Sequence, residues 1–137
     1  MRIWHKDLIP LLPREQLIAQ WRELSAIAGS IIKKGAPNHI LVNFVTDYDY
    51  DHFISYAALV RSEMTSRGYH TMDSVWNKIA NLKPNWTQLP QDKIYKEKMN
   101  KDYLTICYYN LYEKYLCGGI PQDYWNWIDQ TFHLTIN

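Results

Sequence analysis

The first long helical stretch of this sequence carries a carboxylate on a face that other groups can approach. Glu23 lies in QWREL, residues 20–24. Its neighbours three, four and seven positions away on a helix are mostly small or polar: Gln16, Ala19, Ala26, Ile27 and Ser30. A carboxylate in such a place can stabilise a developing cation or remove a proton. The alternative is a solvated charge on an ordinary amphipathic helix.

The start of the chain is the second place where chemistry is conceivable. MRIWHKD brings together Arg2, Trp4, His5 and Lys6 before any expected helix. Terminal segments fray unless something holds them, so a tryptophan here predicts an anchor. We expect Trp4 to fix the α-amino group of Met1 in place. An α-amine is a better nucleophile than lysine at neutral pH, because its ordinary pKa is about 7.7–8.0 against about 10.4.

The run DYDYDH at 47–52 resembles the beginning of a calcium loop, but the rest of that pattern fails. Asp47, Asp49 and Asp51 have the spacing of the first ligands. His52 then stands where the loop needs glycine, and Ala58 where it needs glutamate. We interpret Asp51 as the N-cap of a helix instead. The five histidines show no ligand spacing and no glycine-rich phosphate loop is present, so we expect no metal and no cofactor.

The secondary structure that positions these residues is predicted to be all helical, because apolar residues recur at helical spacing and no period-two alternation is convincing. Leu17, Trp21, Leu24, Ala28 and Ile31 form a buried stripe on the first helix. The predicted helices cover residues 13–34, 51–67, 73–82 and 92–116, with a final turn or short helix from Pro121. The sequence therefore predicts an all-α fold, a single compact domain of three to four main helices spanning 1–137.

Composition is that of a soluble globular protein, with 47% hydrophobic and 21% charged residues. No apolar run is long enough to span a membrane, and the first ten residues contain charges and no apolar core of a signal peptide. We therefore expect a cytoplasmic protein, and a monomer. Cys107 and Cys117 lie about 15 Å apart if both are on one helix, too far for a disulfide.

Charge and aromatic content leave the partner open. The net charge of +1 permits nucleic-acid binding but does not demand it, although residues 61–100 carry seven basic and four acidic side chains. Aromatic residues make up 15% of the chain. Large rings either fill a small core or form a surface that stacks on bases, and we favour the core.

Three segments resemble one known family. MRIW followed by QWREL at 20–24, and HFISYAALVRSEMTSRGY at 52–69, are similar to segments of the pyrimidine-dimer DNA glycosylase family, which includes the phage repair enzyme endonuclease V. Length, helical content, the Arg-Glu-Leu of the first long helix and an aromatic-rich last helix agree with this. The opening and PNH at 37–39 are most similar to the bacterial branch of the family.

The resemblance implies a DNA repair glycosylase with abasic-site lyase activity, acting on damaged double-stranded DNA. In the family an N-terminal α-amine attacks the sugar C1′ and forms a Schiff base, while a helix glutamate, matching Glu23, assists. The arginine before that glutamate, matching Arg22, contacts DNA. Since Arg2 is bulky we expect Met1 to be retained and to supply the amine. Further candidates for DNA contact follow: Arg2, His5, Lys6, Asn38 and His39.

Two other functions remain open. A non-catalytic module of the same fold would bind nucleic acid or a protein through its aromatic surface. An N-glycosidase acting on a small nucleoside would suit a chain of near-neutral charge.

Overall fold

The computed structural model describes residues 1–136, and within that range every regular element is helical. The five α-helices are α1 (Arg14–Lys34), α2 (Tyr50–Ser66), α3 (Asp73–Ala80), α4 (Lys101–Leu116) and α5 (Gln122–Ile136). The three short 3-10 helices are η1 (Lys6–Leu11), η2 (Asn43–Asp47) and η3 (Gln91–Lys93). The predicted all-α, single-domain fold is confirmed, with more helices than the sequence suggested.

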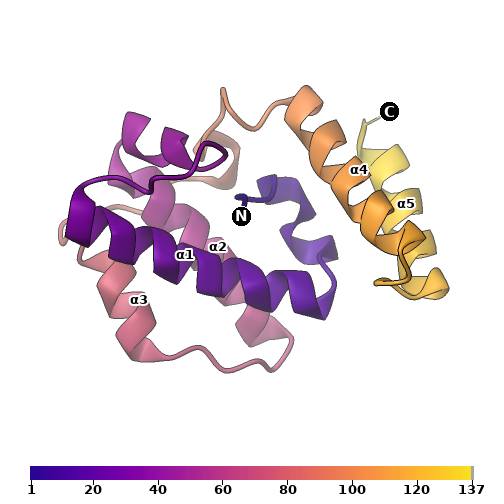
Figure 1. Cartoon of the computed structure of the whole chain (residues 1–137), viewed down its shortest axis with the longest axis horizontal. Helices are drawn as coiled ribbons and strands as arrows, with labels where there is room; N and C mark the ends of the chain where they lie inside the picture. The colour runs from indigo at the N-terminus through magenta and orange to yellow at the C-terminus, as the bar shows by residue number, and fades with distance from the viewer. Residues whose placement is uncertain (137) are drawn as a thin grey trace.

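α1 is the central element because it packs on both α2 and α3 (Figure 1). The predicted stripe from Leu17 to Ile31 is buried, as the helical spacing of its apolar side chains requires. The helix ends where the sequence indicated: Gly35 has a φ of 79°, and its N–H donates to the Ile31 carbonyl over 2.8 Å. Glycine adopts that left-handed conformation without the steric cost of a side chain.

The predicted N-cap of the second helix is wrong by two residues. The N-cap is Asp49, whose side chain accepts a hydrogen bond from the backbone N–H of Asp51 over 2.9 Å. Asp51 lies in the first turn and is free to accept other donors. Either aspartate is a good cap by type, so the spacing alone did not distinguish them.

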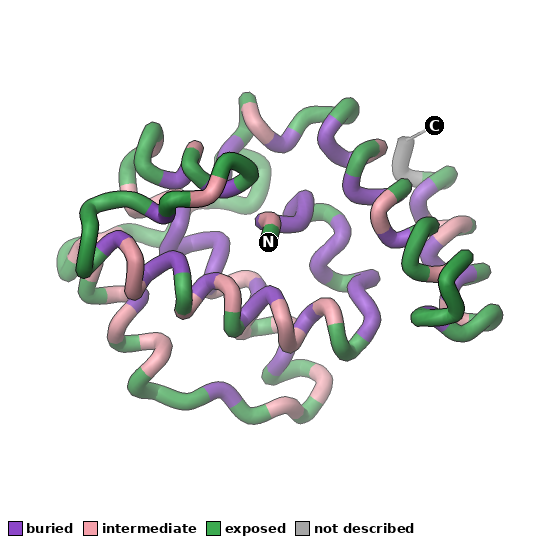
Figure 2. Tube along the Cα trace, viewed as in Figure 1, coloured by how far each residue is buried: buried purple, intermediate pink, exposed green. Residues whose placement is uncertain are grey.

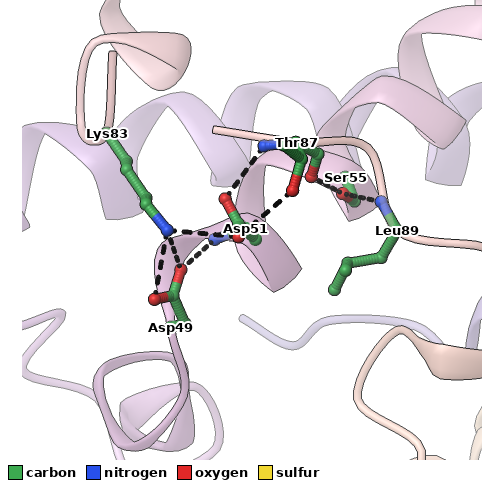
Figure 3. Close-up of polar contacts among 6 residues, drawn as sticks. All are labelled: Asp49, Asp51, Ser55, Lys83, Thr87 and Leu89. Atoms are coloured by element: carbon green, nitrogen blue, oxygen red, sulfur yellow. Dashed lines mark hydrogen bonds and ion pairs between the residues drawn. The ribbon is translucent and has the colours of Figure 1, made fainter. Parts of the chain in front are cut away.

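Asp49 and Asp51 of the DYDYDH run form hydrogen bonds and ion pairs that hold the loop after α3 against the start of α2. The ammonium group of Lys83 lies 3.0 Å from Asp49 Oδ1 and 3.1 Å from Asp51 Oδ2, and the N–H of Thr87 donates to Asp51 Oδ1 over 3.1 Å (Figure 3). One turn further along α2, Ser55 Oγ accepts from the N–H of Leu89 over 2.9 Å. Among the described residues no group of three potential metal-binding side chains occurs.

The prediction of one helix over 92–116 is also wrong. Gln91–Lys93 forms only η3, and Tyr95 then takes a φ of 49°, which no α-helix accommodates. Tyr95 is fully buried against α2, with its N–H donating to His52 Nδ1 over 3.0 Å. α4 begins only after Asn100, whose side chain accepts from the Tyr103 N–H over 2.9 Å.

The final helix is much longer than the short element expected after Pro121. α5 pairs with α4 at the edge of the molecule (Figure 1). Tyr108 stacks on Phe132 with ring centroids 3.9 Å apart, and its hydroxyl bonds the Asp129 carboxylate. Within the described part of the chain no helix has the length and apolar character needed to cross a membrane.

The chain start lies in the middle of the molecule, between α1 and α4 (Figure 1). Residues 3–6 are buried, Ile3 and Trp4 being only 0% and 5% exposed, and the tube in Figure 2 turns purple close to the N-terminus. The prediction that Trp4 anchors this segment is confirmed.

Candidate active site

The terminal segment is held by the side chain of a buried glutamine on α1. Gln20 Oε1 accepts from the Trp4 N–H over 2.8 Å, and Gln20 Nε2 donates to the Arg2 carbonyl over 3.0 Å. The same Nε2 lies 3.4 Å from Glu23 Oε2. One amide therefore contacts both the terminal segment and the carboxylate.

Two tyrosines complete the attachment from the other helices. The hydroxyl of Tyr56 on α2 lies 2.6 Å from the Trp4 carbonyl oxygen, and the hydroxyl of Tyr103 on α4 donates to the Ile3 carbonyl. Burial raises the pKa of both tyrosines, and that of fully buried Tyr56 well above its usual range. Both hydroxyls therefore keep the proton that they donate, and three helices fix the backbone of residues 2–4.

A small pocket opens where this segment meets α1 and α4. Its volume is about 250 Å³. Three predicted site residues line it together: Met1, Arg2 and Glu23. The remaining lining residues come from the anchor, the loop after α1, and α4: Trp4, Leu41, Asn110 and Lys114.

The carboxylate of Glu23 faces the chain start directly. Its Oε2 accepts from the backbone N–H of Arg2 over 3.5 Å. That nitrogen follows Met1, so the α-amino group lies one residue beyond the contact, at the exposed end of the pocket, where Met1 is 46% exposed. Chemically, the arrangement places a primary amine and a partly buried carboxylate at one opening.

The side chain of Arg2 supplies positive charge at the same opening. Its guanidinium carbon lies 5.7 Å from the centre of the Trp4 ring. Nearby Cys107 is a structural thiol, because burial raises its pKa and so keeps it protonated. The pocket thus offers the amines of Met1 and Lys114, a carboxylate and a guanidinium, with no thiolate nucleophile among its described neighbours.

Arg22 does not join this group. It is exposed and lines a different groove, between α1, the end of α2 and α3. Its neighbours there include Ser25, which accepts a hydrogen bond from Lys78 Nζ over 2.7 Å. Consecutive residues on a helix point about 100° apart, so Arg22 and Glu23 face different grooves.

His5 and Lys6 are turned inward, and their role as phosphate contacts stays a prediction. His5 is 3% exposed, with Nε2 2.9 Å from the Met99 carbonyl oxygen and Nδ1 accepting from the Asp7 N–H over 3.1 Å. Lys6 Nζ donates to the Ile94 carbonyl over 2.7 Å, and burial lowers its pKa. Both side chains attach the terminal segment to the stretch before α4.

Asn38 and His39 lie on the loop that follows α1. Asn38 is exposed with a φ of 60°, and His39 Nδ1 accepts from the Leu41 N–H over 3.2 Å. Leu41 lines the pocket, whereas Asn38 and His39 do not. Their bonds shape the loop that borders the opening, and a direct role in binding remains a prediction.

Sequence reasoning missed Gln20, Asn110 and Lys114. A signal existed for Gln20, since it is a polar residue between Leu17 and Leu24 on the apolar face of the first helix. Such a residue must find buried hydrogen-bond partners. Asn110 and Lys114 carried no comparable signal, because they reach the pocket only through the way in which α4 packs.

A sequence model of the family described as pyrimidine dimer DNA glycosylase matches residues 1–77, more than half of the chain. The match includes the terminal segment, α1 and α2, and therefore Gln20, Glu23 and Tyr56. No curated protein and no solved structure matches the chain.

Proposed function

The chain belongs to the pyrimidine dimer DNA glycosylase family, and from this premise we propose that it removes damaged pyrimidines from DNA and cleaves the strand at the abasic site. The observation that carries the proposal is the hydrogen bond from the Arg2 N–H to Glu23 in a pocket that also holds Met1. It brings the end of the chain and the helix carboxylate together at one pocket.

The α-amine of Met1 is the proposed nucleophile. In its neutral form it attacks C1′ of the damaged nucleotide, so that a nitrogen–carbon bond forms while the bond to the base breaks and the base leaves with the electron pair. Loss of the amine proton and opening of the sugar ring then give a Schiff base. The hydrogen bonds at residues 2–4 support this role because they limit how far the amine can move.

Glu23 is the proposed carboxylate partner. It is partly buried and lies beside the terminal segment, so its negative charge can stabilise the sugar cation that develops as the base leaves. The same carboxylate is a base for the proton at C2′, whose removal expels the 3′ phosphate and cuts the strand.

DNA is the proposed substrate, with Arg2 and Lys114 at the pocket and Arg22 in the neighbouring groove as phosphate contacts. Each cation that replaces a phosphate counterion adds affinity without reading sequence. The pocket is complete within a single chain, which supports action as a monomer. We further propose that the protein acts in the cytoplasm on double-stranded damaged DNA.

A duplex containing one cyclobutane pyrimidine dimer tests the proposal. We expect release of the glycosidic bond and strand cleavage at the dimer, and neither in the matched undamaged duplex. Intact damaged DNA after prolonged incubation with the folded protein would overturn it.

The second candidate is an N-glycosidase acting on a free nucleoside. The net charge of +1 and the small volume of the pocket, about 250 Å³, favour it. It predicts base release from nucleosides, little dependence of the rate on salt, and no strand cleavage. The same incubation, repeated with free pyrimidine nucleosides, distinguishes the two.

A further inference from the structure

We propose that Gln20 is the positioning residue that sets the place of the terminal amine relative to the Glu23 carboxylate. This rests on the proposed function, in which that amine and that carboxylate react with one sugar. Gln20 is fully buried and does not line the pocket, so it would act through its neighbours.

The orientation of the Gln20 amide follows from its partners. A backbone N–H only donates, so the atom 2.8 Å from the Trp4 nitrogen must be the oxygen Oε1. The nitrogen Nε2 then faces the Arg2 carbonyl at 3.0 Å and Glu23 Oε2 at 3.4 Å. Both of these groups are acceptors, which suits the two hydrogens of an amide nitrogen.

Both polar atoms of this amide are engaged. Besides the Trp4 N–H, the oxygen lies 2.9 Å from the Tyr56 hydroxyl, which itself lies 2.6 Å from the Trp4 carbonyl oxygen. Oε1 and Nε2 therefore contact residue 4, residue 2, α2 and Glu23 at once. The single Tyr56 proton lies on the shorter bond, to the Trp4 carbonyl. The amide itself therefore makes three hydrogen bonds, with the Trp4 N–H, the Arg2 carbonyl and Glu23, and has little freedom to move.

The choice of glutamine over an apolar or an acidic residue has a physical consequence. A leucine would leave the Trp4 N–H and the Arg2 carbonyl buried without this partner, which costs stability and frees the terminal segment. A glutamate would turn lone pairs toward the Arg2 carbonyl and add a second negative charge beside Glu23. Only an amide accepts from residue 4 while donating to residue 2 and to Glu23.

The test compares Gln20→Leu and Gln20→Glu with Tyr56→Phe as a matched control. The control also removes a buried hydrogen bond to Trp4, but Tyr56 makes no hydrogen bond to Glu23. The first readout is the rate of borohydride-trapped adduct formed at saturating abasic duplex DNA, together with Tm. The second needs no DNA: the pH at which formaldehyde and cyanoborohydride methylate the terminal amine at half-maximal rate.

We expect Gln20→Leu to lose at least about tenfold in trapping rate, and Tyr56→Phe to lose less at a similar decrease in Tm. In Gln20→Glu the added charge favours the ammonium form, so the half-maximal methylation pH rises by about one unit and that of Tyr56→Phe does not. Gln20→Glu retains an acceptor for the Trp4 N–H, and decides the question where Gln20→Leu does not fold.

Equal trapping losses in Gln20→Leu and Tyr56→Phe, with an unchanged methylation profile in Gln20→Glu, would overturn the inference and leave Gln20 a packing residue. The methylation shift without any wild-type adduct would support the positioning role and contradict the lyase. A wild-type adduct together with an unchanged methylation pH in Gln20→Glu would support the lyase and contradict the positioning role.

Discussion

The backbone N–H of Arg2 donates to Glu23 Oε2 over 3.5 Å, joining the chain start to a carboxylate 21 residues later on α1. This contact exists because residues 2–4 are held by Gln20, Tyr56 and Tyr103 from three different helices. The buried terminal segment therefore orders the Met1 end of the chain beside Glu23, and the proposed chemistry depends on that order.

Glu23→Gln removes the negative charge of the carboxylate and keeps the shape of the side chain. The amide oxygen still accepts from the Arg2 N–H, but it stabilises a sugar cation poorly and does not take up a proton. We expect dimer cleavage to decrease by about 10²–10³-fold with duplex affinity nearly unchanged. Glu15→Gln, an exposed position in the first turn of α1, is the control. Unchanged cleavage in Glu23→Gln would remove this residue from the mechanism.

Stability should depend on pH through His5. Burial lowers the pKa of His5, and its two ring nitrogens are satisfied only in the neutral form, with Nδ1 accepting from the Asp7 N–H. The unfolded chain takes up this proton first, so stability decreases as pH falls below about 6.5. We expect Tm to decrease between pH 7 and pH 5 in the wild type and less in His5→Gln. His70→Gln, at an exposed position, should follow the wild type, and parallel curves for all three proteins would contradict the prediction.

The ion pair between Lys83 and Asp49 should stabilise the protein above about pH 4 and lose this effect in acid. The backbone N–H of Asp51 and the Lys83 ammonium lower the pKa of Asp49 below its ordinary value of 3.8. A depressed carboxyl pKa gives stability that is present above the unfolded value and lost as pH falls through the folded one. Asp49→Asn should therefore have a lower Tm than the wild type at pH 7, with the difference vanishing near pH 2–3. Asp47→Asn is the control, and a difference that persists in acid would show that the N-cap alone matters.

DNA binding should weaken when a cationic side chain is removed from the Met1 pocket or from the groove that Arg22 lines. Each lost phosphate contact lowers the slope of log affinity against log salt by about 0.9. We expect Arg22→Ala and Lys114→Ala each to show this change in titrations of a damaged duplex, whereas Lys93→Ala, on η3, does not. Identical slopes for all three variants would place the duplex elsewhere on the surface.

The sequence predicted what local periodicity determines. The α1 stripe, its end at Gly35 and the burial of Trp4 all follow from apolar spacing and residue type within short windows. The three candidates Met1, Arg2 and Glu23 also meet in one pocket, as the family resemblance implied.

The errors arose where distant segments decide the structure. Helical propensity extended the last long helix back to residue 92, but Tyr95 is buried against α2 in a left-handed conformation that ends any such helix. Similarly, the sequence did not predict that His5 and Lys6 contact the carbonyls of Met99 and Ile94. No short window of sequence contains these partners, which lie about 90 residues away along the chain.

Borohydride trapping on a duplex with one abasic site tests the central claim most directly. The wild-type protein, the Glu23→Gln variant and a protein whose terminal amine has been acetylated are compared, with intact mass identifying the terminal residue. We expect a covalent adduct in the wild type, a slower one in Glu23→Gln, and none after acetylation. No wild-type adduct from folded protein, or an adduct that survives acetylation, would contradict amine chemistry at the chain start.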